Sequence, residues 1–224
     1  MRTYVFRFLI IISLVFFCND VFANAGYQWK QIKKKNHIIV FSKKVKNSKF
    51  KMYKASIIID KPIEVIYAVL TDVPTYSDWM PDVEKASVIK QLDKGSLYGN
   101  MVVHVLFDAM WPVKNRDVVV KSVPTITNWD KGNVIINLQD TCEYDVPLEK
   151  GRMRVKKFYA QFNLQNLGRT RTSITYITHA EPGGSIPAGI AQIQTARIPY
   201  KTLRNLAKVS EKQIYIQRAK NKFL

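Results

Sequence analysis

The first elements that the chain predicts come from short hydrophobic runs in residues 38–59. Residues 38–41 (IIVF) and 53–59 (YKASIII) are rich in β-branched and aromatic side chains, and the turn formers Asn47 and Ser48 lie between them. Runs of this length, bounded by turn residues, are typical of β-strands. The pattern therefore predicts two strands joined by a turn near the start of the folded region.

A helical period replaces this pattern after residue 60. The apolar residues there recur at intervals of three and four: Ile63, Ile66, Tyr67 and Leu70. This spacing places them on one face and predicts an α-helix over residues 62–71. A short helical turn over residues 76–79 is predicted to follow and to end before Pro81, because the residue before a proline avoids the helical region.

From residue 83 to residue 180 the chain predicts about six strands, separated by turn signals rich in Asp, Asn and Gly. Successive side chains along a strand point to opposite faces. In residues 100–108 the odd positions are all apolar: Met101, Val103, Val105 and Phe107. In residues 134–144 the even positions include Val134, Ile136 and Leu138. The sheet is therefore predicted to have one apolar face and one wetter face, as an antiparallel sheet over a core should.

A long amphipathic helix is predicted after residue 185, and its apolar side carries Ile190, Ile193, Tyr200, Leu203 and Ala207. Pro199 lies inside this run and is expected to kink it, since proline cannot donate a helical hydrogen bond. The layout is two strands, two helices, about six strands and one long helix. It favours an α+β fold in which a curved antiparallel sheet grips a C-terminal helix.

Residues 1–23 have the composition of a secretory signal peptide. Arg2 and Arg7 precede an apolar run over residues 8–17, and Ala23 offers a cleavage position. A membrane span needs ~20 apolar residues, so a cleaved signal is favoured over an uncleaved anchor. We therefore expect an exported protein, either periplasmic or secreted.

The remaining chain is predicted to be one folded domain over residues 24–215 with a basic C-terminal tail over residues 216–224. Its only cysteine is Cys142, so no internal disulfide can form after cleavage, and a buried position is expected for this thiol. We expect a monomer whose stability comes from packing.

The formal net charge of +18 is concentrated in two places. Residues 21–59 hold ten lysines and no acid, and residues 201–224 hold seven basic residues against Glu211 alone. Such a charge favours an anionic partner, above all an anionic membrane surface, although a merely solvated surface is the alternative. Export makes nucleic acid an unsuitable partner, and the basic strands lack an RNA-binding aromatic motif.

The chain shows no motif for catalysis, for a metal site or for a cofactor. His37, His104 and His179 lie in separate predicted elements without metal-ligand spacing, and one cysteine cannot build a thiolate site. The chain contains no P-loop, Rossmann glycine pattern or nucleophile elbow. We therefore expect no catalytic residues, no metal and no cofactor.

Several motifs in order give the chain a family resemblance over about residues 27–212. They are Trp29 before the first strand, the 62–70 helix with Asp72 and Trp79, Trp111-Pro112 with Arg116-Asp117, Pro182-Gly183-Gly184 before Ile186-Pro187, and Pro199 with Leu203 and Leu206. This set resembles a START (steroidogenic acute regulatory protein-related lipid transfer) domain of the exported bacterial kind. The resemblance implies a helix-grip fold, with an internal tunnel that holds one lipid beneath a helical lid.

The chain departs from the family pattern in two places. Gln192 stands where the last helix is expected to carry Asn. Some sterol-binding members place a charged pair in the tunnel, and the corresponding positions here are Val103 and Ser122. The resemblance therefore implies lipid binding more strongly than sterol recognition.

The apolar sheet face and the lid helix supply the candidate lipid-binding residues. They are Met101, Val103, Val105, Phe107, Arg116, Val118, Val120, Ile136, Leu138, Ile190, Ile193 and Tyr200. For any single one of them ordinary core packing is favoured, because periodicity does not distinguish a filled interior from a hollow one. Gly183 and Gly184 are the candidate lid hinge, because glycine tolerates backbone angles closed to other residues.

Arg116 is the sharpest single candidate. By strand parity it faces the apolar side, where a guanidinium needs a partner. A lipid phosphate or carboxylate could fill that role, and so could Asp140 or Glu143 in a structural ion pair. Asp117, its neighbour, is predicted to face outward and to tie a loop.

The function these features indicate is binding of a lipid or another hydrophobic ligand in an internal tunnel, with transfer between membranes. Two alternatives remain open at this point. One is a helix-grip enzyme of the polyketide cyclase type, which would need two or more facing acid or base groups in the tunnel. The other is a polyanion-binding envelope protein, which would have a solid interior.

Overall fold

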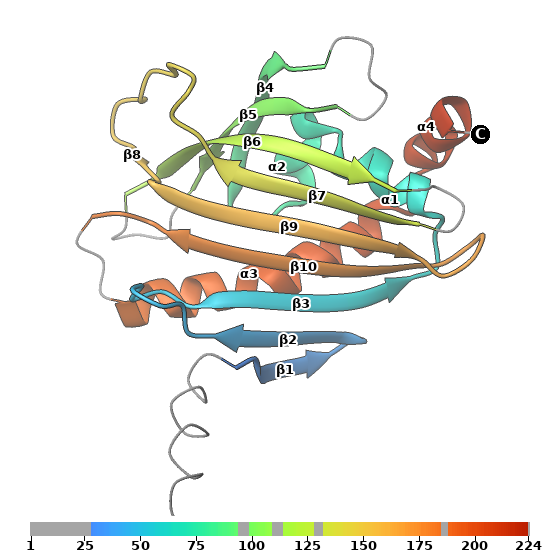
Figure 1. Ribbon diagram of the computed structural model, residues 1–224, viewed down its shortest axis with the longest axis horizontal. Coiled ribbons are helices and arrows are strands. Elements are labelled where there is room, and N and C mark those ends of the chain that lie inside the picture. Colours follow the sequence, from blue (N-terminus) through green and yellow to red (C-terminus); the bar gives the residue numbers. More distant parts are fainter. Residues whose placement is uncertain (1–27, 94–98, 109–113, 128–131, 185–187, 224) are drawn as a thin grey trace, which may run out of the picture.

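The computed structural model describes residues 28–93, 99–108, 114–127, 132–184 and 188–223, without the side chains of 188, 190–195, 222 and 223 (Figure 1). The strands are β1 (Lys30–Lys35), β2 (Ile38–Lys43), β3 (Met52–Ile59), β4 (Val83–Gln91), β5 (Met101–Phe107), β6 (Arg116–Ile126), β7 (Asn133–Asp140), β8 (Met153–Arg154), β9 (Lys157–Asn166) and β10 (Thr172–Glu181). The helices are α1 (Ile63–Leu70), α2 (Tyr76–Trp79), α3 (Ala188–Val209) and α4 (Gln213–Phe223), with a 3₁₀ turn η3 (Val73–Thr75) before α2.

The strands form a single sheet in the order β1-β2-β3-β10-β9-β7-β6-β5-β4. Every neighbouring pair along this path is antiparallel, and the short β8 pairs in parallel with the start of β6. Pairing of β3 with β10 joins the beginning of the chain to its end. The six long strands that the sequence predicts between residues 83 and 180 are all present.

Helix α3 lies against the concave face of the sheet, and the strands curve around it (Figure 1). It contacts β2, β3 and β10, and the side chains of Leu203 and Leu206 are completely buried. Pro199 is buried within α3, and the helix continues through it. The predicted α+β fold, a curved antiparallel sheet gripping a C-terminal helix, is confirmed.

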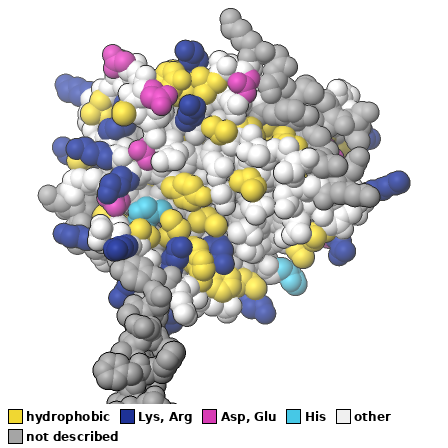
Figure 2. All heavy atoms as spheres, in the orientation of Figure 1, with side chains coloured by type: hydrophobic (Ala, Val, Ile, Leu, Met, Phe, Trp, Pro, Cys, Tyr) yellow, Lys and Arg dark blue, Asp and Glu magenta, His cyan; other side chains and the backbone are white. Residues whose placement is uncertain are grey.

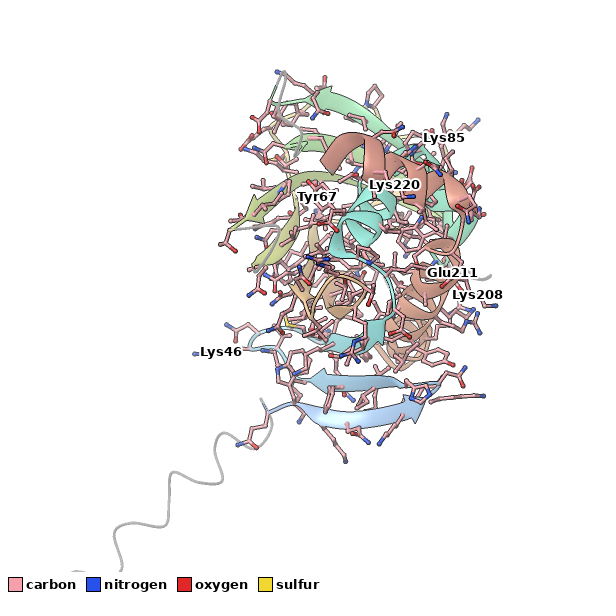
Figure 3. The ribbon with its side chains drawn as sticks, turned by 90° about the vertical axis from the view of Figure 1, so that its right-hand side faces the viewer. Lys46, Tyr67, Lys85, Lys208, Glu211 and Lys220 are labelled. Carbon is pink, nitrogen blue, oxygen red and sulfur yellow. The ribbon has the colours of Figure 1, made fainter. Side chains whose placement is uncertain are left out.

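Three further helical segments close one end of the sheet. Tyr67 of α1 is fully buried and lies within the body of the molecule (Figure 3). Helix α4 packs against α1 through the buried side chains of Tyr215 and Ala219. Residues 216–223, which we expected in a basic tail, therefore belong to a helix packed on the domain. Among the described residues, no helix is long and apolar enough to cross a bilayer.

Strand β1 has no counterpart in the sequence prediction. All six of its residues are exposed, so it shows no alternation of buried and polar positions. It forms because Asn36 and His37 both adopt positive φ values, 50° and 59°, and turn the chain back onto β2. Positive φ at both central residues is the geometry of the tight hairpin turn that matches strand twist.

Cys142 corrects another expectation. It lies just after β7 and is exposed, because β7 ends at Asp140 and the chain leaves the sheet there. Strand parity placed this thiol in the core only on the assumption that the strand continued past residue 140.

On the outer face of the sheet, Asp117 is fully buried beneath the segment that carries β8. His104 Nε2 lies 2.8 Å from its carboxylate, and Arg154 Nε and Nη2 each approach it at 2.9 Å. Arg154 also donates to the carbonyl of Val146 at 2.8 Å. Burial opposes ionisation, but the hydrogen bonds from Arg154 and His104 outweigh it and hold the pKa of Asp117 below its ordinary value. Asp117 thus ties a loop, as predicted, but its side chain is buried beneath that loop instead of facing solvent.

Candidate ligand cavity

A cavity of about 200 Å³ lies between the concave face of the sheet and helix α3. Its wall consists mainly of aliphatic and aromatic side chains from β3, α2, β5, β6, β7, β9, β10 and α3. They include Tyr53, Tyr76, Val105, Phe107, Val118, Val120, Leu138, Val155, Phe158, Ala160, Phe162, Tyr176 and Ile198. A surface of this kind excludes water and favours an apolar guest.

Six of the candidate lipid-binding residues line this cavity: Val105, Phe107, Arg116, Val118, Val120 and Leu138. Four others are buried in the core but do not line it: Met101, Val103, Ile136 and Tyr200. Parity fixes which face of a strand a side chain occupies, but not whether the space above it is filled. These four belong to the same packed cluster as the α1 side chains. Ile190 and Ile193 lie on α3, and their side chains are outside the described part of the chain.

Arg116 reaches the cavity, but its hydrogen-bonding groups are directed at backbone carbonyls. Nε donates to Pro182 O at 3.4 Å and Nη2 donates to Gly183 O at 3.4 Å, while Nη1 donates to Lys114 O. Only 6% of the residue is exposed, and this burial lowers the pKa of its guanidinium. The arginine therefore holds the turn that leads into α3.

Neither acid considered as a partner of Arg116 contacts it. The carboxylate of Asp140 accepts a hydrogen bond from the backbone N–H of Phe158 at 2.6 Å, across the β7–β9 pair. Glu143 lies 3.9 Å from the ammonium of Lys121 on the outer face. The sequence could not place these acids because β7 ends at Asp140, so its last side chain turns toward the neighbouring strand.

Gly183 and Gly184 both have positive φ values, 69° and 70°. A Cβ added at Gly184 would lie 2.9 Å from the terminal methyl group of Met153, whereas one at Gly183 would meet only Arg154 O at 3.7 Å. The two glycines therefore permit a left-handed turn that other residues adopt only with strain. Their role as a lid hinge stays a prediction. Residues 109–113, which contain Trp111-Pro112, and residues 185–187 lie outside the described residues.

The lysine, arginine, aspartate and histidine residues of the cavity gather at one end, which we call the mouth. It is defined by Lys51, Asp82, Asp108, Arg116 and His179, all of which line the cavity. Each lies at or beside the end of a strand, on the side where β10 ends and β3 begins (Figure 1). Because Asp108 is exposed, the cavity reaches the surface here.

Helix α3 is fastened to the mouth by one ion pair. Arg197 Nη2 approaches the two carboxylate oxygens of Asp82 at 2.8 and 2.7 Å. Asp82 itself has a positive φ of 62°, and its carbonyl accepts a hydrogen bond from the backbone N–H of Asp108 at 3.0 Å. This contact fixes the point on α3 that borders the cavity.

The part of the wall that β9, β10 and β3 contribute was not predicted from the sequence. Phe162 and Tyr176 stack with ring centroids 4.4 Å apart, and Tyr53 and Ala160 complete this side. Burial raises the pKa of Tyr176 to about 12, since its phenolate would lose hydration there. The same odd–even reading, applied to residues 157–166 and 172–181, carries the signal that would have found them.

A curved antiparallel sheet closed over a C-terminal helix, with an apolar cavity between them, defines a helix-grip protein. The START domain family model matches residues 22–210, so the chain belongs to the START domain family. This confirms the family and the fold that the motifs predicted.

Individual relatives agree with this assignment. The uncharacterized protein PA1579 of Pseudomonas aeruginosa is 32% identical over 207 residues, covering 91% of this chain and 98% of that protein. The STAR-related lipid transfer protein of Xanthomonas axonopodis has a crystal structure that matches with a TM-score of 0.72 at 26% identity, covering 82% of this chain and 99% of that one. Human STARD10 matches with a TM-score of 0.72 at 20% identity, covering 88% and 80% of the two chains, and shows the shared fold.

Proposed function

We propose that this protein holds one hydrophobic ligand in the cavity beneath α3 and carries it between membranes. The observation that carries the proposal is the cavity itself, whose wall is apolar from Tyr53 on β3 to Ile198 on α3. Membership of the START family and the similarity to a bacterial STAR-related lipid transfer protein support it.

The physical need for such a wall follows from the cost of exposing a lipid to water. Each CH₂ group that leaves an apolar environment costs about 0.8 kcal/mol, so a long acyl chain costs roughly 12 kcal/mol. A carrier must replace almost all of that environment. The side chains of β5, β6, β9 and β10 do so on one side and α3 does so on the other.

The volume narrows the choice of ligand. Pockets for drug-sized ligands measure ~300–1,000 Å³, and the cavity here measures about 200 Å³. A slender molecule with one hydrocarbon chain suits this space better than a lipid with two chains. A bulkier ligand would require α3 to move away from the sheet.

The two alternative functions have less support. An enzyme of the cyclase type would need facing acid and base groups inside the cavity. Among the described residues, the only carboxylates that line it are Asp82 and Asp108, both at the mouth, and Asp82 is engaged by Arg197. A polyanion-binding protein without a ligand would have a solid interior, in contrast to the hollow seen here.

Export to the periplasm or the medium stays part of this proposal, as does docking on an anionic membrane. The exposed lysines of β1 support such docking, because all six residues of that strand face solvent and four of them are lysines. Electrostatic attraction to anionic lipid is worth about 1 kcal/mol per basic residue near the surface.

Native mass spectrometry of the full-length chain, purified from cells without detergent, tests the proposal. We expect a mass increment that matches one small lipid per protein molecule, and organic extraction should release that lipid for identification. A protein that is repeatedly empty, and that takes up no fluorescent single-chain lipid from vesicles, would contradict the proposal.

A further inference from the structure

A second hollow adjoins the mouth of the cavity and points to the chemistry of the ligand. It has a volume of about 440 Å³ and lies in the turn between β2 and β3. Its lining is formed by Lys44, Val45, Asn47, Ser48, Lys49, Phe50 and Lys51. Three of these seven residues are lysines, and none is an acid. We call this feature the lysine hollow.

Lys51 belongs to both spaces, because it lines the lysine hollow and the apolar cavity. Its backbone carbonyl lies 3.3 Å from His179 Nδ1, so the last residue before β3 is held against the end of β10. If the tail of a ligand fills the cavity, the head of that ligand would therefore emerge from the mouth beside Lys51.

The charged groups of the mouth differ in how they are satisfied. Arg116 donates to three backbone carbonyls, and Asp82 is paired with Arg197. Asp108 accepts a hydrogen bond from Asn115 Nδ2 at 2.8 Å. Among the described residues, no hydrogen bond or ion pair is formed by the half-buried ammonium of Lys51. Within the part of the chain that the structure describes, the mouth thus offers one cation that is not paired with an anion.

Glu181, the last residue of β10, lies beside the lysine hollow, because it accepts a hydrogen bond from the side chain of Ser48. The charge of its carboxylate is already engaged. Its carboxylate lies 3.2 Å from Lys157 Nζ and 3.8 Å from His179 Nε2. Burial opposes its ionisation, but hydrogen bonds from Ser48 and Lys157 outweigh burial and lower its pKa. Glu181 therefore carries a negative charge that is engaged by Lys157 and Ser48, while the seven lining residues of the lysine hollow include three lysines and no acid.

We infer that the ligand is an anionic amphiphile with a carboxylate or phosphate-monoester head, and that this head binds at Lys51 in the lysine hollow. The inference rests on the proposed function, since the cavity must hold the tail. The apolar wall excludes a charged head from the interior. The lysine hollow lies where the head emerges, and Lys44 and Lys49 add positive charge around it. A cavity of about 200 Å³ suits the single chain of such a molecule.

The surface around this site agrees with an anionic guest. Lysine and arginine side chains lie along the left edge of the molecule in Figure 2, where β3 begins and β10 ends in Figure 1, with some acidic side chains among them. Long-range attraction from these charges would raise the association rate of an anionic molecule with the mouth.

The test compares cis-parinaric acid, a fluorescent fatty acid, with its methyl ester. The two share a tail, and the ester replaces the ionised carboxylate with an uncharged head that is one methyl group larger. Titrations are run near pH 8, where the carboxyl group of the acid is ionised. We expect the wild-type protein to bind the acid about tenfold more tightly than the ester, as one charge-assisted contact provides. We also expect this preference to weaken in high salt.

Two variants of equal charge locate the effect. Lys51→Gln should lower the affinity for the acid by much more than it changes the affinity for the ester, and the binding of the ester also shows that the variant is folded. Lys46→Gln is the matched control, because Lys46 lies on the same turn but does not line the lysine hollow and extends away from the body of the protein (Figure 3). It should keep the preference.

The outcomes separate this inference from the proposed function. Binding of neither probe would contradict the proposed function itself. Equal binding of acid and ester by the wild type, or an equal loss of preference in both variants, would overturn the assignment to Lys51 and leave the cavity as a neutral-lipid site. Inorganic phosphate and dodecyl phosphate are then compared as competitors of the acid. If inorganic phosphate displaces the acid as effectively as dodecyl phosphate does, the lysine hollow binds a free anion, and the inference of an amphiphile head at Lys51 is also overturned.

Discussion

Filling the cavity with one larger side chain should stabilise the protein and weaken ligand binding at the same time. Ala160 is the residue to change, because it is 2% exposed and lines the cavity from the middle of β9. Ala160→Leu adds three carbon atoms that would occupy empty space. In a solid interior the same change would force neighbours apart.

The magnitude follows from the transfer of those three carbons. At about 0.8 kcal/mol each, their burial contributes roughly 2.4 kcal/mol, and the lost rotamer freedom of leucine opposes this by ~0.5–1 kcal/mol. The ligand-free protein should therefore gain about 1.5 kcal/mol in its free energy of unfolding. A ligand that loses the space of three carbons should bind about 50-fold more weakly.

The control is the same substitution at Ala55, which is completely buried on β3 and does not line the cavity. Overpacking a filled core costs ~1–3 kcal/mol, so Ala55→Leu should destabilise the protein. The assay is urea unfolding of delipidated protein, followed by titration with a fluorescent single-chain lipid. If Ala160→Leu destabilised the protein as much as Ala55→Leu does, the hollow would not exist in solution and the reasoning would fail.

Three further predictions concern the buried carboxylate, the cavity phenol and the turn into α3. Asp117→Asn should lower the free energy of unfolding by about 2–3 kcal/mol, because it leaves Arg154 without its anion. Since the pKa of Asp117 is lowered, this difference in urea stability should be present at neutral pH and vanish as the pH falls through that pKa, so a difference that persists in acid would count against the ion pair. The pKa of Tyr176 is raised to about 12, so its contribution should be complete below pH ~10 and disappear as the pH rises toward 12. The free energy of unfolding, measured by urea titration, should therefore fall less with rising alkaline pH in Tyr176→Phe than in the wild type. An identical fall in both proteins would contradict the burial of this phenol. Gly183→Ala should cost about 1–2 kcal/mol and slow lipid release measured by stopped-flow transfer to vesicles, because its φ is 69°. The control is Gly151→Ala, because Gly151 has a comparable φ of 85° in another turn. If Gly183 acts as the hinge, Gly151→Ala should lower the free energy of unfolding without changing the rate of lipid release.

Much of the architecture could be read from the chain because its elements are built from local periodicity. The helical spacing of Ile63, Ile66 and Leu70 and the alternation along residues 101–107 and 134–138 report directly which side chains share a face. The two strands that were missed lack such a signal. Strand β1 is exposed throughout, and the two-residue β8 is too short for any period to show.

The candidate site shows the same contrast between features that local periodicity reports and features that it does not. Parity identified the face that carries Val105, Val118 and Leu138, and these residues do line the cavity. It could not distinguish them from Val103 or Ile136, which face the same way and are equally buried but do not line the cavity. Whether the space above a side chain is empty depends on elements far apart in the sequence.

By itself, then, the sequence determined the order of the elements, the apolar face of the sheet and the family, since each of these is encoded in the spacing of neighbouring residues. The tertiary structure alone decided where Arg116 donates its hydrogen bonds, which acid holds Arg154, and that Lys51 borders both the cavity and the lysine hollow. The physical reason is that hydrogen bonds, ion pairs and cavities depend on distances of a few ångströms between segments that only folding brings together.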